Sequence, residues 1–227
     1  MYKIYKFLII LIFLILPFSA NSHVEHYNDL NRIEFDIYRN NKNIGKHIFS
    51  FRKQDGELFV DSEINFKIKK LGVVLYKYYV KGTEVYKDGK LIKFNSKTNQ
   101  NGKEKYVNMI MQDGEYVIDG SSYKGKAPTD YLIGTWWNHS IVEAAAQISA
   151  VSGRIIKQKV TFLGKEKIKF GTKTYNTLHF NFSSSDQKLN KEKKLNTDVW
   201  YDEKTLNWVK ASFEKRGKWE YKLILID

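Results

Sequence analysis

Apolar and polar residues alternate with a period of two along most of the chain, which is the pattern of β-strands that bury one face. The clearest case is the segment 58–70, in which one parity is apolar and the other is polar: Leu58, Val60, Ile64, Phe66 and Ile68 against Asp61, Glu63, Asn65, Lys67 and Lys69. Turn pairs such as Asp88-Gly89, which favour two-residue hairpin loops, separate the segments. The pattern predicts about eleven strands connected as antiparallel meanders.

The predicted strands 58–70 and 73–86 are longer than the usual five or six residues. Long antiparallel strands curl, because each pair is twisted relative to the next. We therefore expect an all-β fold, with a single antiparallel, strongly curved sheet that forms a barrel or half-barrel.

The segment 127–153 lacks this alternation. Ser140 and Glu143 have the spacing of a capping box, three alanines follow at 144–146, and Gly153 can end a helix in the left-handed conformation. These features predict one short helix near 141–150, placed between two meanders.

The residues before this helix include the unbroken apolar run Tyr131-Leu132-Ile133. An apolar run without alternation is expected to cross an end of the sheet rather than to join it, and to bury itself against the apolar interior. We predict that Trp136 or Trp137 is mostly buried there, and that Asn138 turns the chain into the helix.

Residues 1–22 have the pattern of a secretory signal peptide: Lys3 and Lys6, then the apolar run 7–16, then small residues at Ala20 and Ser22. An uncleaved anchor is the alternative, but a membrane-spanning helix needs about twenty apolar residues. We expect a periplasmic or secreted protein with a single β-barrel-like domain at 23–227. The chain has no cysteine, so a lipid-modified cysteine, disulfides and cysteine-ligated metals are excluded.

The chain is basic, with 38 Lys and Arg against 25 Asp and Glu and a formal charge of +13. Removing the two leader lysines leaves +13 − 2 = +11 for residues 23–227. Such a charge can indicate anionic partners. Because the lysines are spread over strands and turns, a solvated surface is the plainer interpretation. We expect a monomer that does not bind nucleic acid.

Motifs of catalysis and cofactor binding are weak or incomplete. Ser121-Ser122-Tyr123-Lys124 matches Ser-x-x-Lys but lies in a glycine-flanked loop rather than at a helix start. The segment 120–126 has the glycine and lysine spacing of a phosphate-binding loop, but Ala127 replaces the required Ser or Thr. We therefore expect no catalytic residue, no metal and no cofactor.

Aromatic residues are abundant, with 15 Tyr, 14 Phe and 5 Trp. Many of them suit half-buried strands. The adjacent Trp136 and Trp137 are unusual, because neighbouring residues of a strand face opposite sides, so one can fill the core while the other faces a ligand. The sequence predicts an exported, non-enzymatic protein that binds a hydrophobic or amphipathic ligand, such as a lipid, at the following residues: Trp136, Trp137, Tyr76, Tyr78 and Glu84.

Two alternatives remain open. The basic charge favours a surface-binding protein for anionic envelope lipids or polysaccharide. An enzyme acting on an envelope component would draw its acid–base residues from Asp61, Glu63, Glu84 and Asp119. Of these, Glu84 shares the parity of Tyr76, Tyr78 and Tyr86, so its burial in a pocket would favour the enzyme.

Several short motifs occur in order along almost the whole exported part: 35–39 followed by Ile44-Gly45, then Ile64-Asn65-Phe66, Trp137-Asn138, Ser152-Gly153, Leu163-Gly164 and Trp200-Tyr201-Asp202. With these motifs the chain resembles an uncharacterised family, a domain of unknown function, of exported proteobacterial β-rich proteins. The resemblance implies export and a one-domain architecture. It implies no activity and no catalytic residue, and the run 188–194 looks like an insertion.

Overall fold

The computed structural model describes residues 27 and 29–227, and the predicted signal peptide at 1–22 lies outside them. The described chain folds into one fifteen-stranded sheet with the order β8-β7-β6-β5-β4-β3-β2-β1-β15-β14-β13-β12-β11-β10-β9. The strands are β1 Arg32–Arg39, β2 Lys42–Gln54, β3 Glu57–Lys70, β4 Val73–Lys87, β5 Lys90–Gln100, β6 Lys103–Gln112, β7 Glu115–Gly120, β8 Lys124–Pro128, β9 Leu132–Ile133, β10 Ala146–Ile148, β11 Ile155–Phe170, β12 Lys173–Ser184, β13 Asn196–Asp202, β14 Trp208–Glu214 and β15 Lys218–Ile226.

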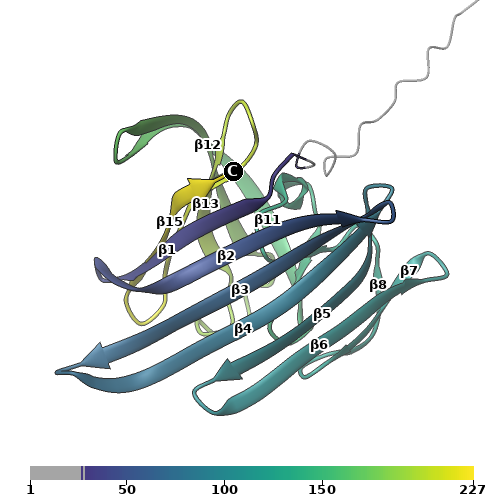
Figure 1. Cartoon of the computed structure of the whole chain (residues 1–227). Helices are drawn as coiled ribbons and strands as arrows, with labels where there is room; N and C mark the ends of the chain where they lie inside the picture. Colours follow the sequence, from purple (N-terminus) through teal and green to yellow (C-terminus); the bar gives the residue numbers. More distant parts are fainter. Residues whose placement is uncertain (1–26, 28) are drawn as a thin grey trace, which may run out of the picture.

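The sheet is strongly curved, with β1 to β8 in front of the strands β11 to β13 in the view of Figure 1. Its two halves are joined by the antiparallel pairing of β1 with β15, in which Ile37 lies opposite Tyr221. Among the described strands, only β9 and β10 pair in parallel, and the outermost strands β8 and β9 are not paired with each other. The expected all-β, barrel-like curved sheet is confirmed.

The hairpin turns adopt the left-handed backbone that Asn, Asp and Gly tolerate. Asp55, Asp88, Asn101 and Asp113 have φ between 48° and 53°, and each precedes a glycine. Because the strands run up and down, alternate turns lie at the same end of the sheet. We call the end that holds the turns at 40–41, 71–72, 101–102 and 216–217 the tip end.

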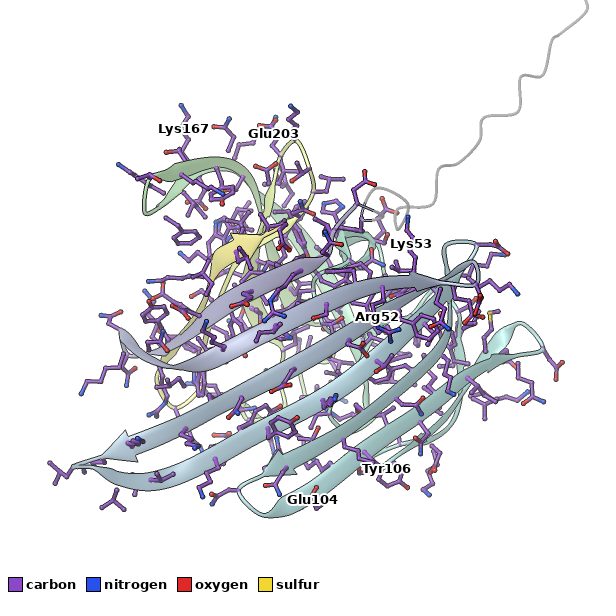
Figure 2. All side chains as sticks on the ribbon, in the orientation of Figure 1. Arg52, Lys53, Glu104, Tyr106, Lys167 and Glu203 are labelled. Carbon is purple, nitrogen blue, oxygen red and sulfur yellow. The ribbon has the colours of Figure 1, made fainter. Side chains whose placement is uncertain are left out.

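The opposite end holds the turns at 55–56, 88–89 and 113–114 and is crossed by residues 129–139; we call it the plugged end. The inner face of the sheet is apolar, with Phe35, Phe49, Phe94, Phe182 and Trp208 almost completely buried. Charged side chains such as Arg52, Lys167 and Glu203 lie on the outside of the ribbon (Figure 2).

The predicted helix near 141–150 is wrong in extent and type. The structure has a short 3₁₀ helix at His139–Val142, which Asn138 caps by accepting a hydrogen bond from the Ser140 amide. The chain then enters β10, because Gln158 on β11 donates to the carbonyls of Ile141 and Ala144 and so holds this segment against the sheet. Tertiary hydrogen bonds override the helix propensity of the three alanines.

The expectation that the crossing segment stays out of the sheet is only partly right. Leu132 and Ile133 form the short strand β9 and pair with β10, whereas Gly134 to Asn138 cross the plugged end. The predicted loop 120–126 also contains the start of β8, in which Gly125 lies opposite Ile118. Among the described residues, no helix has the length and apolarity needed to span a membrane.

Candidate functional site

The plugged end is closed by Trp137, whose side chain is 0% exposed. Its indole packs edge-on against Tyr27, Phe51 and Tyr86, with ring centroids 5.1, 5.4 and 5.6 Å apart. Edge-to-face packing of this kind stabilises aromatic clusters beyond their buried area. Trp137 is therefore part of the core, which confirms its predicted burial.

Glu84 on β4 holds the crossing segment in place. Its Oε1 accepts hydrogen bonds from Trp137 Nε1 and from Thr135 Oγ1, each at 2.9 Å, and its Oε2 accepts one from the Tyr86 hydroxyl at 2.5 Å. Burial raises the pKa of Glu84, and the three hydrogen bonds oppose that rise. Both carboxylate oxygens are used by groups of the chain itself, so the structure gives Glu84 an anchoring role.

A surface depression of about 410 Å³ lies at the tip end and one of about 550 Å³ at the plugged end. The larger one is lined by Tyr86, Leu91, Tyr116 and Asn138 among others, but not by Glu84. The Tyr86 side chain stands between the depression and the carboxylate, because its hydroxyl donates to Glu84. The enzyme hypothesis required Glu84 to be buried in a pocket. Glu84 is buried, but its carboxylate does not line the depression.

The interior between the two ends is built from aromatic rings. The Trp208 indole packs on Phe35 at 3.8 Å between ring centroids, and on His47, Trp136 and Tyr221 at 5.7 to 5.8 Å. These side chains come from β1, β2, β14, β15 and the crossing segment, which the curved sheet brings together. We call this set, with Phe49, the aromatic interior.

The aromatic interior contains polar nitrogens without a partner among the described residues: Trp136 Nε1, Trp208 Nε1 and both ring nitrogens of His47. Burial lowers the pKa of His47 to about 3, so its imidazole is neutral at neutral pH and offers one donor and one acceptor. Buried polar groups in native proteins are almost always hydrogen-bonded. A concentration of unpartnered nitrogens on adjacent rings is the expected feature of a site that receives a polar group from outside the chain.

Towards the tip end the aromatic side chains become half-buried. Phe66 stacks on Tyr78 with centroids 4.7 Å apart, and it contacts Tyr76 at 6.2 Å and Trp219 at 5.3 Å. Trp219 in turn stacks on Phe213 at 5.7 Å. Tyr76, Tyr78, Phe213 and Trp219 are all partly exposed, in contrast to the fully buried plugged end. Aromatic side chains that pack against the interior are therefore partly exposed at the tip end.

The five predicted ligand residues fall into two groups. Trp136 belongs to the aromatic interior, and Tyr76 and Tyr78 lie at its tip end. Burial raises the pKa of Tyr78, and the neighbouring Tyr221 and Tyr76 raise it further. Trp137 and Glu84 bind each other at the plugged end instead. The two tryptophans separate because Trp136 has a left-handed backbone, with φ of 62°, which turns its ring away from that of Trp137.

Sequence reasoning missed the contributions of His47, Trp208, Phe213 and Tyr221. The signal for two of them was present, because His47 shares its parity with Phe49 and Phe51, and Tyr221 shares its parity with Trp219 and Leu223. Their convergence depends on the pairing of β1 with β15, which connects the two ends of the chain and has no local signature.

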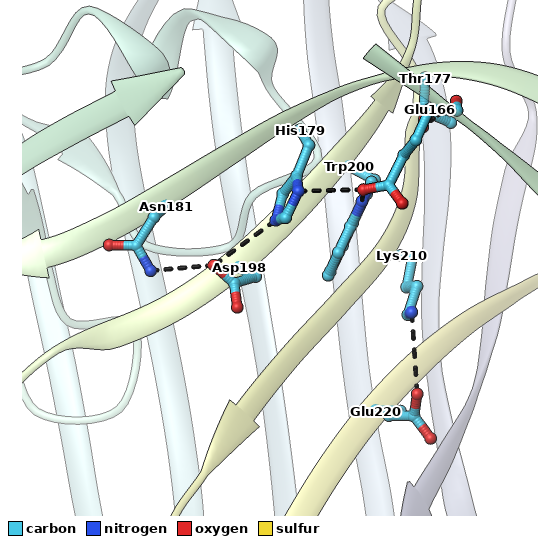
Figure 3. Close-up of polar contacts among 8 residues, drawn as sticks. All are labelled: Glu166, Thr177, His179, Asn181, Asp198, Trp200, Lys210 and Glu220. Atoms are coloured by element: carbon cyan, nitrogen blue, oxygen red, sulfur yellow. Dashed lines mark hydrogen bonds and ion pairs between the residues drawn. The ribbon is translucent and has the colours of Figure 1, made fainter. Parts of the chain in front are cut away.

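A second polar cluster lies on the outer face of the sheet (Figure 3). His179 Nδ1 lies 2.9 Å from Glu166 Oε1 and its Nε2 lies 3.5 Å from Asp198 Oδ1, while its ring stacks on Trp200 at 4.1 Å. Lys210 Nζ lies 4.4 Å from the centre of the Trp200 ring. The carboxylates and the stacked rings hold β11, β12 and β13 together. Within the described residues, no group of three or more His, Asp or Glu is arranged to hold a metal.

Of the other three carboxylates considered for catalysis, Asp61 and Asp119 form contacts on the outer face, and Glu63 lies partly exposed on the same face of β3 as Asp61. Asp61 accepts from Thr83 Oγ1 at 2.5 Å and pairs with Arg52 at 3.4 Å. Asp119 pairs with Lys124 at 2.7 Å, and this contact lowers the pKa of the exposed carboxyl. These contacts support solvated ion pairs and bring neither residue near Glu84.

The sequence of the chain matches a known protein family. Residues 35–224 match the family model described as domain of unknown function (DUF6134), and the chain belongs to that family. The resemblance to a domain-of-unknown-function family is thus confirmed. No curated protein matches the chain in sequence.

The fold has relatives among solved structures. The chain is similar to a β-barrel-like protein of the domain of unknown function DUF1849 from Brucella abortus, with a TM-score of 0.62, 10% identity, and coverage of 87% of this chain and 97% of that one. A protein from Bacteroides fragilis assigned as exported, with a YmcC-like fold, shows a TM-score of 0.37, 8% identity, and coverage of 86% and 94%. The first of these supports the barrel-like fold alone.

Proposed function

We propose that this protein is an exported carrier or sensor that binds one amphipathic molecule in its aromatic interior. The apolar part of the molecule lies along Phe66, Tyr76, Tyr78 and Trp219, where the interior is half-buried. Its polar group reaches inward and pairs with the neutral imidazole of His47 and the indole nitrogens of Trp136 and Trp208. Export rests on the signal-peptide pattern of residues 1–22.

The observation that carries the proposal is the set of buried, unpartnered nitrogens on His47, Trp136 and Trp208. A buried polar atom without a partner costs about 1–3 kcal/mol, and a core that needed only apolar packing would use Phe or Leu at these positions. Trp208 packs on both His47 and Trp136, and three such neighbouring rings therefore support a bound polar group. The aromatic surroundings favour a ligand that carries an apolar portion beside it.

The test is a titration of the delipidated protein with a fluorescent fatty-acid analogue. His47→Phe and Trp136→Phe each remove nitrogen groups and retain an aromatic ring, and each is expected to weaken binding about tenfold, the equivalent of one hydrogen bond of about 1.4 kcal/mol. Trp200→Phe is the matched control, because Trp200 lies on the outer face. Absence of binding to the native protein, or equal affinities of all four proteins, would overturn the proposal.

A further inference from the structure

The hairpin of β3 and β4 extends beyond the rest of the sheet. Strand β2 pairs with β3 only as far as Phe66, and β5 pairs with β4 only from Tyr78 onward, whereas β3 and β4 continue to pair up to Lys70 and Val73. Figure 1 shows this hairpin projecting past its neighbours at the lower left. We call residues 67–77 the β3–β4 tip.

The β3–β4 tip exposes aliphatic side chains. Leu71 is 95% exposed, Val73 62%, Leu75 54% and Val74 37%. Single exposed apolar residues are ordinary, but four within five residues on a free hairpin form a contiguous apolar surface of the kind that marks interaction sites.

The turn residue Leu71 adopts a backbone conformation that leucine disfavours. It has a φ of 50°, the left-handed conformation, which four of the other hairpin turns fill with Asp55, Asp88, Asn101 and Asp113 and one fills with Arg216. A leucine in that conformation is less stable than Asn or Asp, and its exposure adds a second penalty. An unfavourable residue at the most exposed point of the chain indicates that its apolar side chain has a use.

Lysines surround this apolar surface without acidic neighbours. Residues 64–83 contain five lysines, at positions 67, 69, 70, 77 and 81, and neither Asp nor Glu. Within the described residues none of these lysines forms a salt bridge. The depression of about 410 Å³ at the base of the hairpin is lined by Lys42, Lys67 and Lys69 together with Phe66.

Further cations converge on the same end of the sheet. Lys105 on β6 has a lowered pKa, first through partial burial and then through repulsion from Lys103, Lys215 and Arg154, which belong to separate segments. Arg154 also donates to the Lys193 carbonyl at 3.3 Å, which ties the lysine-rich loop 185–195 to this end. The meander geometry thus gathers lysines that are scattered in the sequence.

We propose that the tip end docks on an anionic lipid bilayer, with Leu71, Val73 and Leu75 entering the boundary between headgroups and acyl chains and with the surrounding lysines contacting lipid phosphates. A polyanionic polysaccharide would use the lysines but not the aliphatic tip, so the tip favours the bilayer. The half-buried Tyr76 and Tyr78 lie on the same hairpin, so docking places this partly exposed end of the aromatic interior at the membrane surface. The docking does not depend on the interior ligand.

The test is sedimentation of the purified protein with phosphatidylcholine vesicles that contain or lack about one-third phosphatidylglycerol. The native protein is expected to bind the anionic vesicles, with an affinity that falls steeply between 50 and 500 mM salt (about a threefold drop in screening length), and to ignore the neutral ones. Lys67→Gln/Lys69→Gln/Lys70→Gln should weaken binding by roughly a hundredfold, at roughly fivefold for each lysine. Lys53→Gln/Lys87→Gln/Lys90→Gln, an equal charge change at the plugged end, should have a much smaller effect.

The apolar part is tested with Leu71→Asn/Leu75→Asn. Asn is favoured in the left-handed conformation, so the substitution at position 71 should not lower the melting temperature. Vesicle binding should weaken at least fivefold. The matched control is Leu163→Asn, because Leu163 on β11 is 53% exposed, nearly the same as Leu75. Failure of the native protein to bind anionic vesicles would overturn the proposal. So would unchanged vesicle binding by the tip variants, or equal binding to a soluble anionic polysaccharide that the leucine changes leave unaffected.

Discussion

The indole nitrogen of Trp137 donates a 2.9 Å hydrogen bond to the carboxylate of Glu84, a residue that lies 53 positions earlier on β4. This contact fixes the crossing segment to the sheet and closes the plugged end. Because the same segment carries Trp136 into the interior, the bond also positions a ring of the proposed ligand site. The structural and functional roles of the two adjacent tryptophans are therefore linked through one buried carboxylate.

Trp137→Ala is expected to lower the free energy of unfolding by about 3–5 kcal/mol, the usual loss for a buried large aromatic side chain. Trp137→Phe keeps most of the ring contacts and loses the hydrogen bond to Glu84, so its loss should be smaller, about 1.5–3 kcal/mol. Urea denaturation measures both changes. A loss below about 1 kcal/mol for the alanine variant would show that the plugged end does not depend on this ring.

Glu84→Gln should change the pH dependence of stability. Burial raises the pKa of Glu84 in the folded protein above its ordinary value of 4.5, so its favourable contribution is present below that value and is lost as the pH rises through the folded pKa. The neutral glutamine lacks this loss. Stability of the native protein relative to the variant, measured by urea midpoints, should therefore fall from pH 4.5 upward. Parallel stability curves for the two proteins would contradict the burial of this carboxyl.

His47→Phe should remove an acid sensitivity. Burial lowers the pKa of His47 from 6.5 to about 3, so its contribution to stability is present above pH 6.5 and is lost as the pH falls towards the folded pKa. The native protein should lose up to about 1.4 kcal/mol per pH unit relative to the variant over that range. Parallel stability curves for the two proteins between pH 6.5 and 4 would contradict the burial of a neutral imidazole.

Gly45→Ala tests the packing of β2 on β3. A Cβ at Gly45 would lie 2.1 Å from the Asn65 carbonyl oxygen and 2.5 Å from Phe66 Cβ, so the backbone must shift. We expect a destabilisation of about 2 kcal/mol or more. At Gly82 the nearest atom, Ser62 Oγ, would lie 3.2 Å away, so Gly82→Ala should cost clearly less. Equal melting temperatures of the two variants would show that Gly45 is not required.

Much of the fold follows from the sequence, because alternation and turn residues act locally. The Asp-Gly and Asn-Gly turns occur where the pattern places them, and the long strands curl as expected. The helix near 141–150 was predicted from equally local signals. In the structure, the side chain of Gln158 on another strand donates hydrogen bonds to two carbonyls of this segment. Propensity cannot anticipate a partner supplied by another strand.

The sequence predicted an aromatic inward-facing site but not all of the residues that form it. Alternation predicted that Tyr76 and Tyr78 share one face of their strand, and the lack of alternation in 127–153 predicted a buried tryptophan there. All three side chains pack in or against the core. Which of the two tryptophans enters the interior depends on the left-handed backbone of Trp136, and the role of His47 depends on rings from β14 and β15. The lysines looked evenly spread along the chain, and only the up-and-down connection of the strands gathers them at the tip end.

Native mass spectrometry of the protein isolated from its own host tests the central claim most directly. We expect a 1:1 complex with an amphipathic molecule that dissociates on activation, is depleted in preparations of Trp136→Phe and His47→Phe, and persists at the native level in Trp200→Phe. Isolation of the native protein at its bare mass under conditions that preserve lipid complexes, together with a failure of lipid extracts to restore any adduct, would contradict it.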